Sequence, residues 1–447
     1  MSEPQTQTRS RPARGEELEL DVDTLAYGGR GVARADGYVV FVDGALPGDR
    51  VRARLTKSKR GYGEAQTVEL LRPSPDRVAR SCEHGGEPCP GAPWQELPYE
   101  LQLSHKRDQV GEALGRIGGL EGFELEQIEP ALEQWRYRNK LEYSFGARDG
   151  ELVLGFHARG RWDLILDADD CKLASEANNA ARNEVRDWAR YVAVPAYDRR
   201  AQEGVLRNLV VREGRRTGER QTRLVTSAAS IPEPPVDLHT LIEGPSGGTD
   251  GETGVLGREY LTEELSGLSL RISPAAFFQT NTEMAERLYA IAAEFAQLRG
   301  TERLFDLFCG IGTIGLTMAP RAGEVWGIES TPEAVADAEF NASSNGIDNA
   351  SFVSGDARVS LRPLVERAGQ PDVVVVDPPR AGLSKKIVRR LIECDAKRIV
   401  YVSCNPTTLA PNAAQLVEAG YRLRRVKPVD MFPQTPHIEC VALLEKQ

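Results

Sequence analysis

The periodicity of apolar and polar positions changes along this chain of 447 residues. From about Leu270 onward, short apolar runs alternate with segments of helical periodicity. Strands are predicted at 303–308, 324–328, 351–353, 372–376 and 398–402, with helices between them, for example at 332–344 and 385–392. The four consecutive valines at 373–376 suit a strand that is buried on both faces. This alternation predicts an α/β fold with a parallel sheet and crossover helices.

A different rhythm occupies residues 16–74. Short alternating runs at 18–22, 38–42 and 51–55 are separated by turns that contain glycine. We expect five short strands here, which predicts a small β-barrel of the OB type. Residues 52–62 carry five basic side chains and no acid, and they end on Tyr62. A basic groove with an aromatic side chain is how such barrels hold single-stranded nucleic acid, and a solvated loop is the alternative.

Between these two parts, residues 75–265 predict a central α+β domain. A loop that bears cysteines comes first, at 80–95, and a helix at about 99–117 follows, which can pack on the catalytic domain. Mixed strands and one helix near 174–191 come next, and 230–254 reads as a loop or linker rich in Pro, Gly and acids. The predicted units are therefore a disordered polar tail at 1–15, the barrel at 16–74, the central domain at 75–265 and the catalytic domain at 266–447.

Composition narrows the class of protein. The chain is 40% apolar and 27% charged, as in ordinary soluble globular proteins, and no apolar run approaches the ~20 residues of a membrane span. Seven cysteines do not make a disulfide framework, so we expect a cytoplasmic monomer with reduced thiols and no membrane partner. A net charge of −10 argues against a nucleic-acid coat protein but leaves room for a local basic groove.

A glycine-rich segment at 306–315 follows the first strand of the C-terminal half. It contains Gly310 and Gly312 at a strand-to-helix turn, where glycine lets the backbone approach a ligand. Glu329 ends the next strand, where an acid can accept both hydroxyls of a ribose. Asp356 follows the third strand, either as an acceptor for an adenine amino group or as a helix N-cap. This pattern fits a dinucleotide-dependent oxidoreductase as well as a methyltransferase.

The segment Asp377-Pro378-Pro379-Arg380 at the end of the fourth strand distinguishes these two classes. A dehydrogenase has no evident use for it, whereas in adenosylmethionine-dependent enzymes an acid and rigid prolines here line the pocket where the methyl donor meets the base. For the motif alone, a proline-capped turn is the alternative. Together with the glycine loop and Glu329, the motif predicts S-adenosyl-L-methionine as the cofactor.

Cys404 and Glu439 are the candidate nucleophile and base. Cys404 follows the apolar run 398–402 and stands in a turn before Asn-Pro, and Glu439 ends the segment 432–439. Methylation of a pyrimidine at carbon 5 needs a thiolate that adds to carbon 6 and a base that removes the carbon-5 proton. The surroundings must partly ionise the thiol for this reaction. His437 is an alternative base, but a histidine without a partner is more often structural, and we prefer Glu439.

The remaining thiols divide into two groups. Cys309, Cys394 and Cys440 are interpreted as small buried hydrophobic residues. Cys82 and Cys89 lie in the cysteine-bearing loop at 80–95, and Cys171 lies farther along the central domain. Cys404 is thus the thiol that we assign to covalent catalysis.

With these motifs the chain resembles the RNA uracil-5-methyltransferase family, which makes 5-methyluridine in ribosomal and transfer RNA. The resemblance runs from the barrel to the C-terminus and rests on the segments 273–281, 306–312, 377–380, 401–406 and the one around Glu439. It implies an N-terminal TRAM domain and a Rossmann-like class I methyltransferase domain, with Cys404 as nucleophile and Glu439 as base. It places Gln279, Phe308, Glu329, Asp356 and Asp377 around adenosylmethionine.

Two further positions can be compared with the family. Thr313 stands where members often carry Asn, which puts its contact with the cofactor in question. The central domain carries the family's Tyr-Arg-Asn-Lys segment at 137–140.

The clearest departure from the family lies in the cysteine loop. Many members hold a [4Fe–4S] cluster with four cysteines, and such a cluster normally takes four thiolates. Here Cys82, Cys89 and Cys171 match three of these positions and Ala92 stands at the fourth. Three thiolates could hold a cluster with an open iron, His84 could substitute for the missing ligand, or the loop has lost the metal and kept its shape. Methyl transfer itself needs no metal.

The expected substrate is RNA, because a uracil must leave its stack or lie in a loop to reach a thiol in a pocket. The barrel favours 23S ribosomal RNA by analogy, with transfer RNA as the alternative. Six arginines of the central domain are candidates for phosphate contacts, with surface solvation as the alternative: Arg207, Arg212, Arg215, Arg216, Arg220 and Arg223. Competing functions are a methyltransferase for another RNA atom, a non-catalytic RNA-binding protein and a dinucleotide oxidoreductase.

Overall fold

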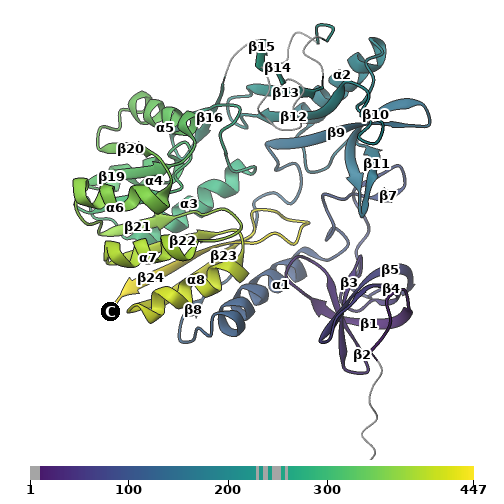
Figure 1. Ribbon diagram of the computed structural model, residues 1–447, viewed down its shortest axis with the longest axis horizontal. Coiled ribbons are helices and arrows are strands. Elements are labelled where there is room, and N and C mark those ends of the chain that lie inside the picture. Colours follow the sequence, from purple (N-terminus) through teal and green to yellow (C-terminus); the bar gives the residue numbers. More distant parts are fainter. Residues whose placement is uncertain (1–10, 228–230, 235–239, 244–252, 257–259) are drawn as a thin grey trace, which may run out of the picture.

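The computed structural model describes residues 11–227, 231–234, 240–243, 253–256 and 260–447. Three bodies are visible in Figure 1: a small barrel, a central domain built on an antiparallel sheet, and a larger α/β domain that contains the C-terminus. Within the described residues, no helix is long and apolar enough to cross a membrane.

The first body is the predicted barrel, and it is closed. Its strands pair in the order β1-β2-β3-β5-β4. Their bounds are β1 Glu17–Leu25, β2 Gly31–Ala35, β3 Tyr38–Asp43, β4 Arg50–Ser58 and β5 Tyr62–Arg72. Alternate small aliphatic side chains such as Val40, Val42, Val51 and Ala53 fill the interior, as period-two patterning predicts. Residues 1–10 of the predicted tail lie outside the described residues, whereas Gly15 donates a backbone hydrogen bond to Leu55, so 11–15 belong to the barrel.

The basic run of the barrel differs from expectation, because acids from neighbouring strands face it. Arg52 pairs with Glu69, Arg54 with Glu17 and Lys57 with Glu64. Cross-strand pairing brings these acids opposite the arginines and lysine, although they are distant in sequence. Lys59 and Arg60, at the β4–β5 turn, have no ion pair with any residue that the structure describes, so this turn carries unpaired positive charge.

The central domain is built on a seven-stranded sheet in the order β11-β10-β9-β12-β13-β14-β15. Its elements are β9 Lys140–Arg148, β10 Glu151–Ala158, β11 Arg161–Asp167, α2 Glu176–Tyr191, β12 Leu206–Glu213, β13 Arg220–Thr226, β14 Thr240–Glu243 and β15 Thr253–Leu256. Helix α2 starts at its N-cap Ser175 and packs on β10 and β12. The prediction of a loop at 230–254 is wrong at 240–243 and 253–254, where β14 and β15 add to the sheet. Most of the other residues of this segment lie outside the described residues.

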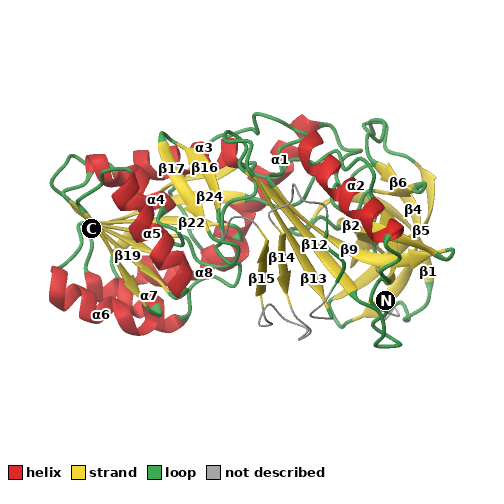
Figure 2. Ribbon diagram, turned by 90° about the horizontal axis from the view of Figure 1, so that it is seen from above, coloured by secondary structure: helices red, strands yellow, loops and turns green. Residues whose placement is uncertain are grey.

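The α/β domain carries an eight-stranded sheet in the order β20-β19-β18-β21-β22-β24-β23-β8. Helices cover both of its faces (Figure 2). The strands are β8 Glu124–Leu125, β18 Arg303–Leu307, β19 Glu324–Glu329, β20 Ala350–Ser354, β21 Val373–Val376, β22 Arg398–Ser403, β23 Tyr421–Val429 and β24 Glu439–Lys446. The helices are α3 Thr282–Ala296, α4 Thr313–Met318, the 3-10 turn Ala319–Arg321, α5 Pro332–Ser344, α6 Ala357–Ala368, α7 Lys385–Cys394 and α8 Pro406–Glu418.

Two cores lie on opposite faces of this sheet, which confirms the α/β expectation. Val374 and Val376 belong to one core with α6, α7 and α8, and Val373 and Val375 to the other with α3 and α4. The hairpin of β16 (Leu261–Leu265) and β17 (Leu268–Ile272) also packs into the second core. The predicted domain boundary at 265/266 therefore falls inside this hairpin.

Helix α1 (Tyr99–Glu112) with its π-helical end (Ala113–Ile117) packs on the α/β domain, as proposed for the segment 99–117. Its buried face is partly polar and includes Gln102, Lys106 and Gln109, while Ile117 is exposed. The Lys106 ammonium is completely buried and donates to Asp430 and to the carbonyl of Phe432. The hydropathy of the segment could not identify this buried face, because Lys106 is buried only through its ion pair with Asp430, which is distant in sequence.

Replacing Lys106 by Met is expected to destabilise the protein by about 3–5 kcal/mol, since the change leaves the buried Asp430 carboxylate unpaired. The measurement is the free energy of urea unfolding followed by fluorescence. Lys397→Met is the control, because Lys397 pairs with Asp372 with 76% of its side chain exposed and should change stability by no more than ~1 kcal/mol. Equal effects of the two variants would contradict this account.

Candidate active site

Cys404 and Glu439 are brought together by an antiparallel strand pair. The pairing of β22 with β24 ends with Ser403 opposite Cys440. Cys404 follows and Glu439 precedes this last pair, so the two residues lie at the same end of the strand pair. Asn405 caps α8 and holds the turn that carries Cys404. Of the seven cysteines, Cys404 alone is partly exposed, while Cys309, Cys394 and Cys440 are buried as expected.

Burial disfavours the charged forms of both groups. Burial, followed by the nearby Glu439 and Asp377, raises the pKa of Cys404 to about 12, and Arg380 acts in the opposite direction. Burial and then Asp377 raise the pKa of Glu439 well above its ordinary value. Burial raises the pKa of Asp377 to about 7. Arg380 is therefore the side chain that favours the thiolate.

Alkylation of Cys404 by iodoacetamide is expected to be slow at neutral pH and still to rise about tenfold per pH unit at pH 10, where an ordinary thiol has levelled off, because only the thiolate reacts and its pKa is raised. Arg380→Gln should slow alkylation about tenfold by removing the favourable cation, and Asp377→Asn should accelerate it above pH 8. Peptide mass spectrometry at timed intervals measures both rates. Similar rates in the two variants would contradict the assigned charges.

A cradle for a nucleoside lies at the carboxyl ends of the parallel strands, the edge where ligands bind in such sheets. Gly310 and Gly312 have φ values of +54° and +85°, and a Cβ on Gly310 would meet nothing within 4 Å, so the backbone borders open space. Phe308 also has a positive φ, of 65°, an unusual conformation that is concentrated at functional sites. The Glu329 carboxylate accepts from the backbone N–H of Gly310 at 3.2 Å, which joins the ends of β18 and β19.

The other predicted cofactor residues differ in how deeply their side chains are buried. Gln279 and Thr313 are buried beside this edge, and the Thr313 hydroxyl lies 3.4 Å from the hydroxyl of Tyr289. Asp356 caps α6 by accepting from the Arg358 backbone and also pairs with the Arg358 side chain. The N-cap interpretation of Asp356 is therefore confirmed, and its contact with adenine stays a prediction. An open glycine cradle with an acid at the next strand end fits an adenosyl ligand.

Hydrophobic periodicity missed the residues that hold the segment 430–439 in place. Gln102 on α1 accepts from the Gln434 backbone, and the Tyr137 hydroxyl donates to the carbonyl of Pro433 at 3.0 Å. Asn139 from the same Tyr-Arg-Asn-Lys segment donates to the carbonyl of Gln279 at 2.9 Å. The central domain thus fixes both the base and the cofactor side of the site. Polar residues in an otherwise apolar helix and in a family motif were the available signals.

The barrel also reaches the site through its β1–β2 turn. The Tyr27 hydroxyl donates to the carbonyl of Cys404 at 3.3 Å. A Cβ on Gly29 would lie 2.8 Å from Pro436, so glycine permits the close approach of this turn to the segment that carries Glu439. The barrel is therefore part of the wall around the nucleophile.

Three of the six central-domain arginines have structural partners, which corrects the prediction of phosphate contacts for these three. Arg212 is buried and donates to the carbonyls of Ser273 and Ala276. Arg215 pairs with Glu213 and Glu283, and Arg216 pairs with Glu286 of α3. Of the other three, Arg207 stacks on Tyr197, Arg220 donates to the carbonyl of Ala177, and Arg223 also has a partner, so that their contact with phosphate stays a prediction. These side chains attach the central sheet to the catalytic domain and to itself.

The comparisons with known proteins agree with this geometry. The tRNA (uracil-5-)-methyltransferase family model matches residues 247–447, and the TRAM domain model matches residues 12–68. An uncharacterized RNA methyltransferase of Halalkalibacterium halodurans is 37% identical, with 96% of each chain covered. Another, of Caldanaerobacter subterraneus, is 39% identical, with 97% of this chain and 100% of the relative covered.

A solved structure covers nearly the whole chain. The Pyrococcus abyssi tRNA (uracil-54, C5)-methyltransferase, in complex with S-adenosyl-L-homocysteine, superposes with a TM-score of 0.78 at 29% identity, over 96% of this chain and 100% of that one. This structural match, the two family models and the full-length relatives lead to the same conclusion. The chain belongs to the family of adenosylmethionine-dependent RNA methyltransferases that join a TRAM domain to a catalytic domain of the uracil-5-methyltransferase type.

Proposed function

We propose that this enzyme forms 5-methyluridine in RNA through a covalent bond between Cys404 and carbon 6 of the target uracil. The observation that carries the proposal is the pairing of β22 with β24, which leaves a partly exposed thiol and a buried carboxyl group at the same end of the strand pair. The glycine cradle with Glu329 opens at the same edge of the sheet. A nucleophile, a base and a nucleoside site at one edge are the three requirements of carbon-5 methylation.

The chemistry proceeds by addition and elimination. The Cys404 thiol gives its proton to solvent and its sulfur bonds to carbon 6, so that the electron pair of the 5,6 double bond moves to carbon 5 and is shared with the carbon-4 oxygen as an enolate. Adenosylmethionine, when bound, would supply the methyl group that bonds to carbon 5, and its sulfur would keep the electron pair of the broken sulfur–methyl bond. Glu439 then accepts the proton of carbon 5, the double bond forms again, and the sulfur of Cys404 leaves with the electron pair of the carbon–sulfur bond.

The protonation of Glu439 adds a condition. Burial and then Asp377 raise its pKa well above the ordinary value, which favours the protonated carboxyl group, whereas a base must be ionised. Arg380, whose charge lowers the pKa of both Glu439 and Cys404, is therefore the residue that we expect to prepare both groups. It is held by its carbonyl, which accepts from the side chain of Asn405 at 3.0 Å.

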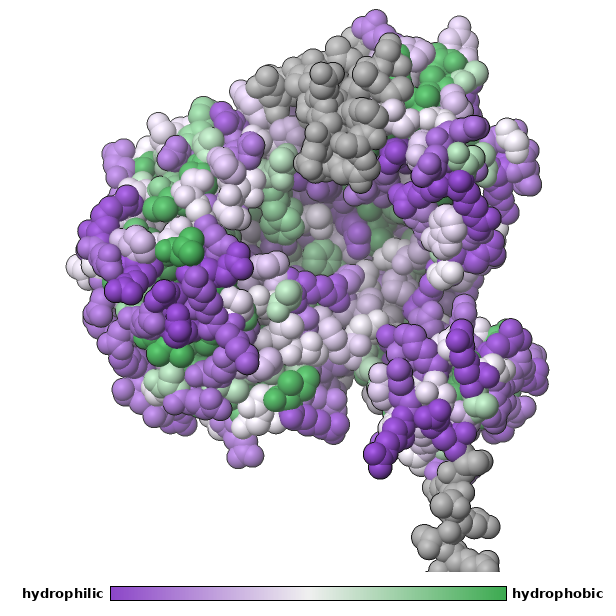
Figure 3. Space-filling model, in the orientation of Figure 1, coloured by the Kyte–Doolittle hydropathy of each residue, from purple (hydrophilic) through white to green (hydrophobic). Residues whose placement is uncertain are grey.

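The shape of the surface suits a structured RNA. Figure 3 shows a hollow that is bordered by the α/β domain, the central domain and the barrel. Phe277 lies two residues from Gln279 with 68% of its surface exposed, as a base-stacking side chain would. Lys59 and Arg60 at the barrel supply charge for the phosphate backbone.

We favour 23S ribosomal RNA as the substrate because the enzyme carries an N-terminal barrel, an argument by analogy. Transfer RNA is the second candidate, since the Pyrococcus abyssi protein, similar over nearly the full chain, is named for uracil 54 of tRNA. A cytoplasmic location and a monomeric state stay predictions.

Mass-spectrometric mapping of 5-methyluridine in ribosomal and transfer RNA, from cells with and without this gene, tests the proposal. We expect one or a few uridines to lose their methyl group in the deletion strain and to regain it with the wild-type gene but not with a Cys404→Ala gene. An unchanged map would reject the product, and a change confined to tRNA would reject the ribosomal substrate.

A further inference from the structure

Three buried side chains with metal-binding atoms meet in the cysteine loop. The ligand atoms of Cys82, His84 and Cys89 all lie within 4.8 Å of one another. The Cys82 Sγ and the His84 Nε2 are 3.7 Å apart, and His84 is only 4% exposed. Outside a metal site, three such groups rarely converge in an apolar setting, because each of them loses water without gaining a strong partner.

The backbone presents these atoms from a short hairpin of β6 (Glu83–His84) and β7 (Glu87–Pro88). Gly85 and Gly86 turn the chain with positive φ values, and the Cys89 N–H donates to the carbonyl of Cys82 at 3.3 Å. The Gln95 side chain holds both backbone groups of Cys82, at 2.7 and 2.8 Å. The sulfur of Cys82 and the imidazole are therefore fixed by rigid main chain.

Cys171, in the loop after β11, is fully buried and lines one pocket together with Cys89. Its sulfur is not among the ligand atoms that lie within 4.8 Å of one another, so it has to move inward to reach an ion held by the other three. The two loops touch, since a Cβ on Gly91 would lie 3.2 Å from the Leu173 side chain. The Cys171 N–H donates to the Asn179 side chain at 3.0 Å, which orients this thiol.

This donor set does not fit a [4Fe–4S] cluster with four cysteines. Ala92 offers no ligand atom and is fully buried at the position in question. In a cluster each thiolate binds its own iron, which separates the thiolates more widely than a single ion does. One tetrahedral ion, with bonds of about 2.3 Å to sulfur and 2.0–2.1 Å to nitrogen, holds its ligand atoms roughly 3.5–3.8 Å apart. The 3.7 Å between Cys82 and His84 matches that spacing.

We propose that Cys82, Cys89, Cys171 and His84 bind a single divalent ion of the zinc type in a closed structural site. The imidazole replaces the thiolate that Ala92 cannot provide. A closed set of four protein ligands leaves no position for substrate, so the ion acts by holding the hairpin to the central domain.

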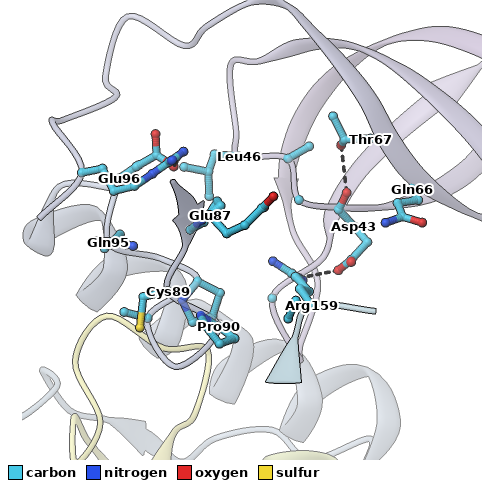
Figure 4. A pocket seen from close by; sticks show the side chains of 18 of the residues that line it. Asp43, Leu46, Gln66, Thr67, Glu87, Cys89, Pro90, Gln95, Glu96 and Arg159 are labelled. Carbon is cyan, nitrogen blue, oxygen red and sulfur yellow. Dashed lines mark hydrogen bonds and ion pairs between the residues drawn. The ribbon is translucent and has the colours of Figure 1, made fainter. Parts of the chain in front are cut away.

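A cavity beside the metal site offers a path for the ion, and the loop that bears the site contacts the segment that leads to Glu439. Figure 4 shows a cavity of about 460 Å³ between the barrel and the central domain, with Cys89 and Pro90 in its wall and the Asp43–Arg159 ion pair across it. An ion can enter from this cavity. At the far end of the loop, the backbone N–H of Trp94 donates to the carbonyl of Gln434 at 3.0 Å. Loss of the ion is therefore expected to loosen the segment that leads to Glu439.

Metal analysis of the full-length protein tests this proposal. The protein is purified without oxygen from cells supplied with both iron and zinc, and metals and acid-labile sulfide are measured. We expect about one zinc per chain and far less iron, and an X-ray absorption spectrum with three sulfur neighbours and one nitrogen. Replacement by cobalt should give the intense visible bands of a tetrahedral thiolate site.

His84→Ala should remove the nitrogen neighbour and weaken zinc binding more than ~100-fold, because loss of an outer-shell partner alone costs 10–100-fold. His105→Ala, a histidine on α1 outside the cluster, is the control and should keep the metal. Four irons with four sulfides per chain, a metal-free protein with a Cys82–Cys89 disulfide, or an unchanged nitrogen signal in His84→Ala would each overturn the proposal. The wild-type spectrum decides even where a variant fails to fold.

Discussion

Replacing Cys404 by alanine is expected to lower methyl transfer to uracil by at least ~10⁴-fold while leaving the affinity for RNA and for adenosylmethionine nearly unchanged. Losses of this size follow removal of a catalytic nucleophile, because every later step depends on its bond to the substrate. In this enzyme the loss is expected at the first step, since carbon 5 of uracil has no other route to an enolate. Methyl transfer is measured with labelled adenosylmethionine, and RNA affinity by filter binding.

Cys440→Ala provides the matched control. Cys440 is the neighbouring thiol in the same strand pair, is fully buried, and donates to the carbonyl of Ser403 at 3.6 Å. Its removal should cost some stability but leave the rate within a few-fold of wild type. Undiminished turnover in Cys404→Ala would instead support transfer to an exocyclic amine, which needs no thiol.

Replacing Glu439 by Gln is expected to stop the reaction after methyl transfer, with the RNA still attached to the protein. The amide keeps the size of the side chain but cannot accept the carbon-5 proton, so the sulfur of Cys404 cannot leave. We expect turnover to fall by about 10²–10⁴-fold, as for loss of a general base. A covalent protein–RNA complex should accumulate and be visible on a denaturing gel.

Two comparisons make this result specific. The double variant Cys404→Ala, Glu439→Gln should form no complex, because the bond runs through the thiol. His437→Ala should release its product normally, since burial and then Arg380 lower the pKa of His437 to about 4 and leave it a weak base. Normal release by Glu439→Gln together with trapping in His437→Ala would transfer the role of base to His437.

The regular parts of the fold could be predicted from the sequence because they depend on local periodicity. The helix at 332–344 begins and ends as predicted, and the strand at 398–402 is extended by one residue. The barrel followed from alternation and glycine turns. Local patterns fail where partners are distant in sequence: Lys106 needs Asp430, and Arg216 needs Glu286. The arginines appeared free for phosphate because the acids that face them come from other elements.

The site was predictable in its residue types but not in its arrangement. Strand ends followed by Gly310, Glu329, Asp377 and Cys404 placed the candidate groups along one edge of a parallel sheet. Their relation to Glu439 depends on β24, which enters antiparallel between β22 and β23, a register that no local signal determines. The contribution of Tyr27 could not be predicted either, because it requires the barrel to dock against the catalytic domain.

Peptide mass spectrometry of the complex trapped with Glu439→Gln, RNA and adenosylmethionine tests the central claim most directly. After digestion with protease and nuclease, we predict a peptide that contains Cys404 joined to one uridine nucleotide whose mass is increased by one methyl group. A methylated nucleotide found free of the protein, or attached to any residue other than Cys404, would contradict the proposed mechanism.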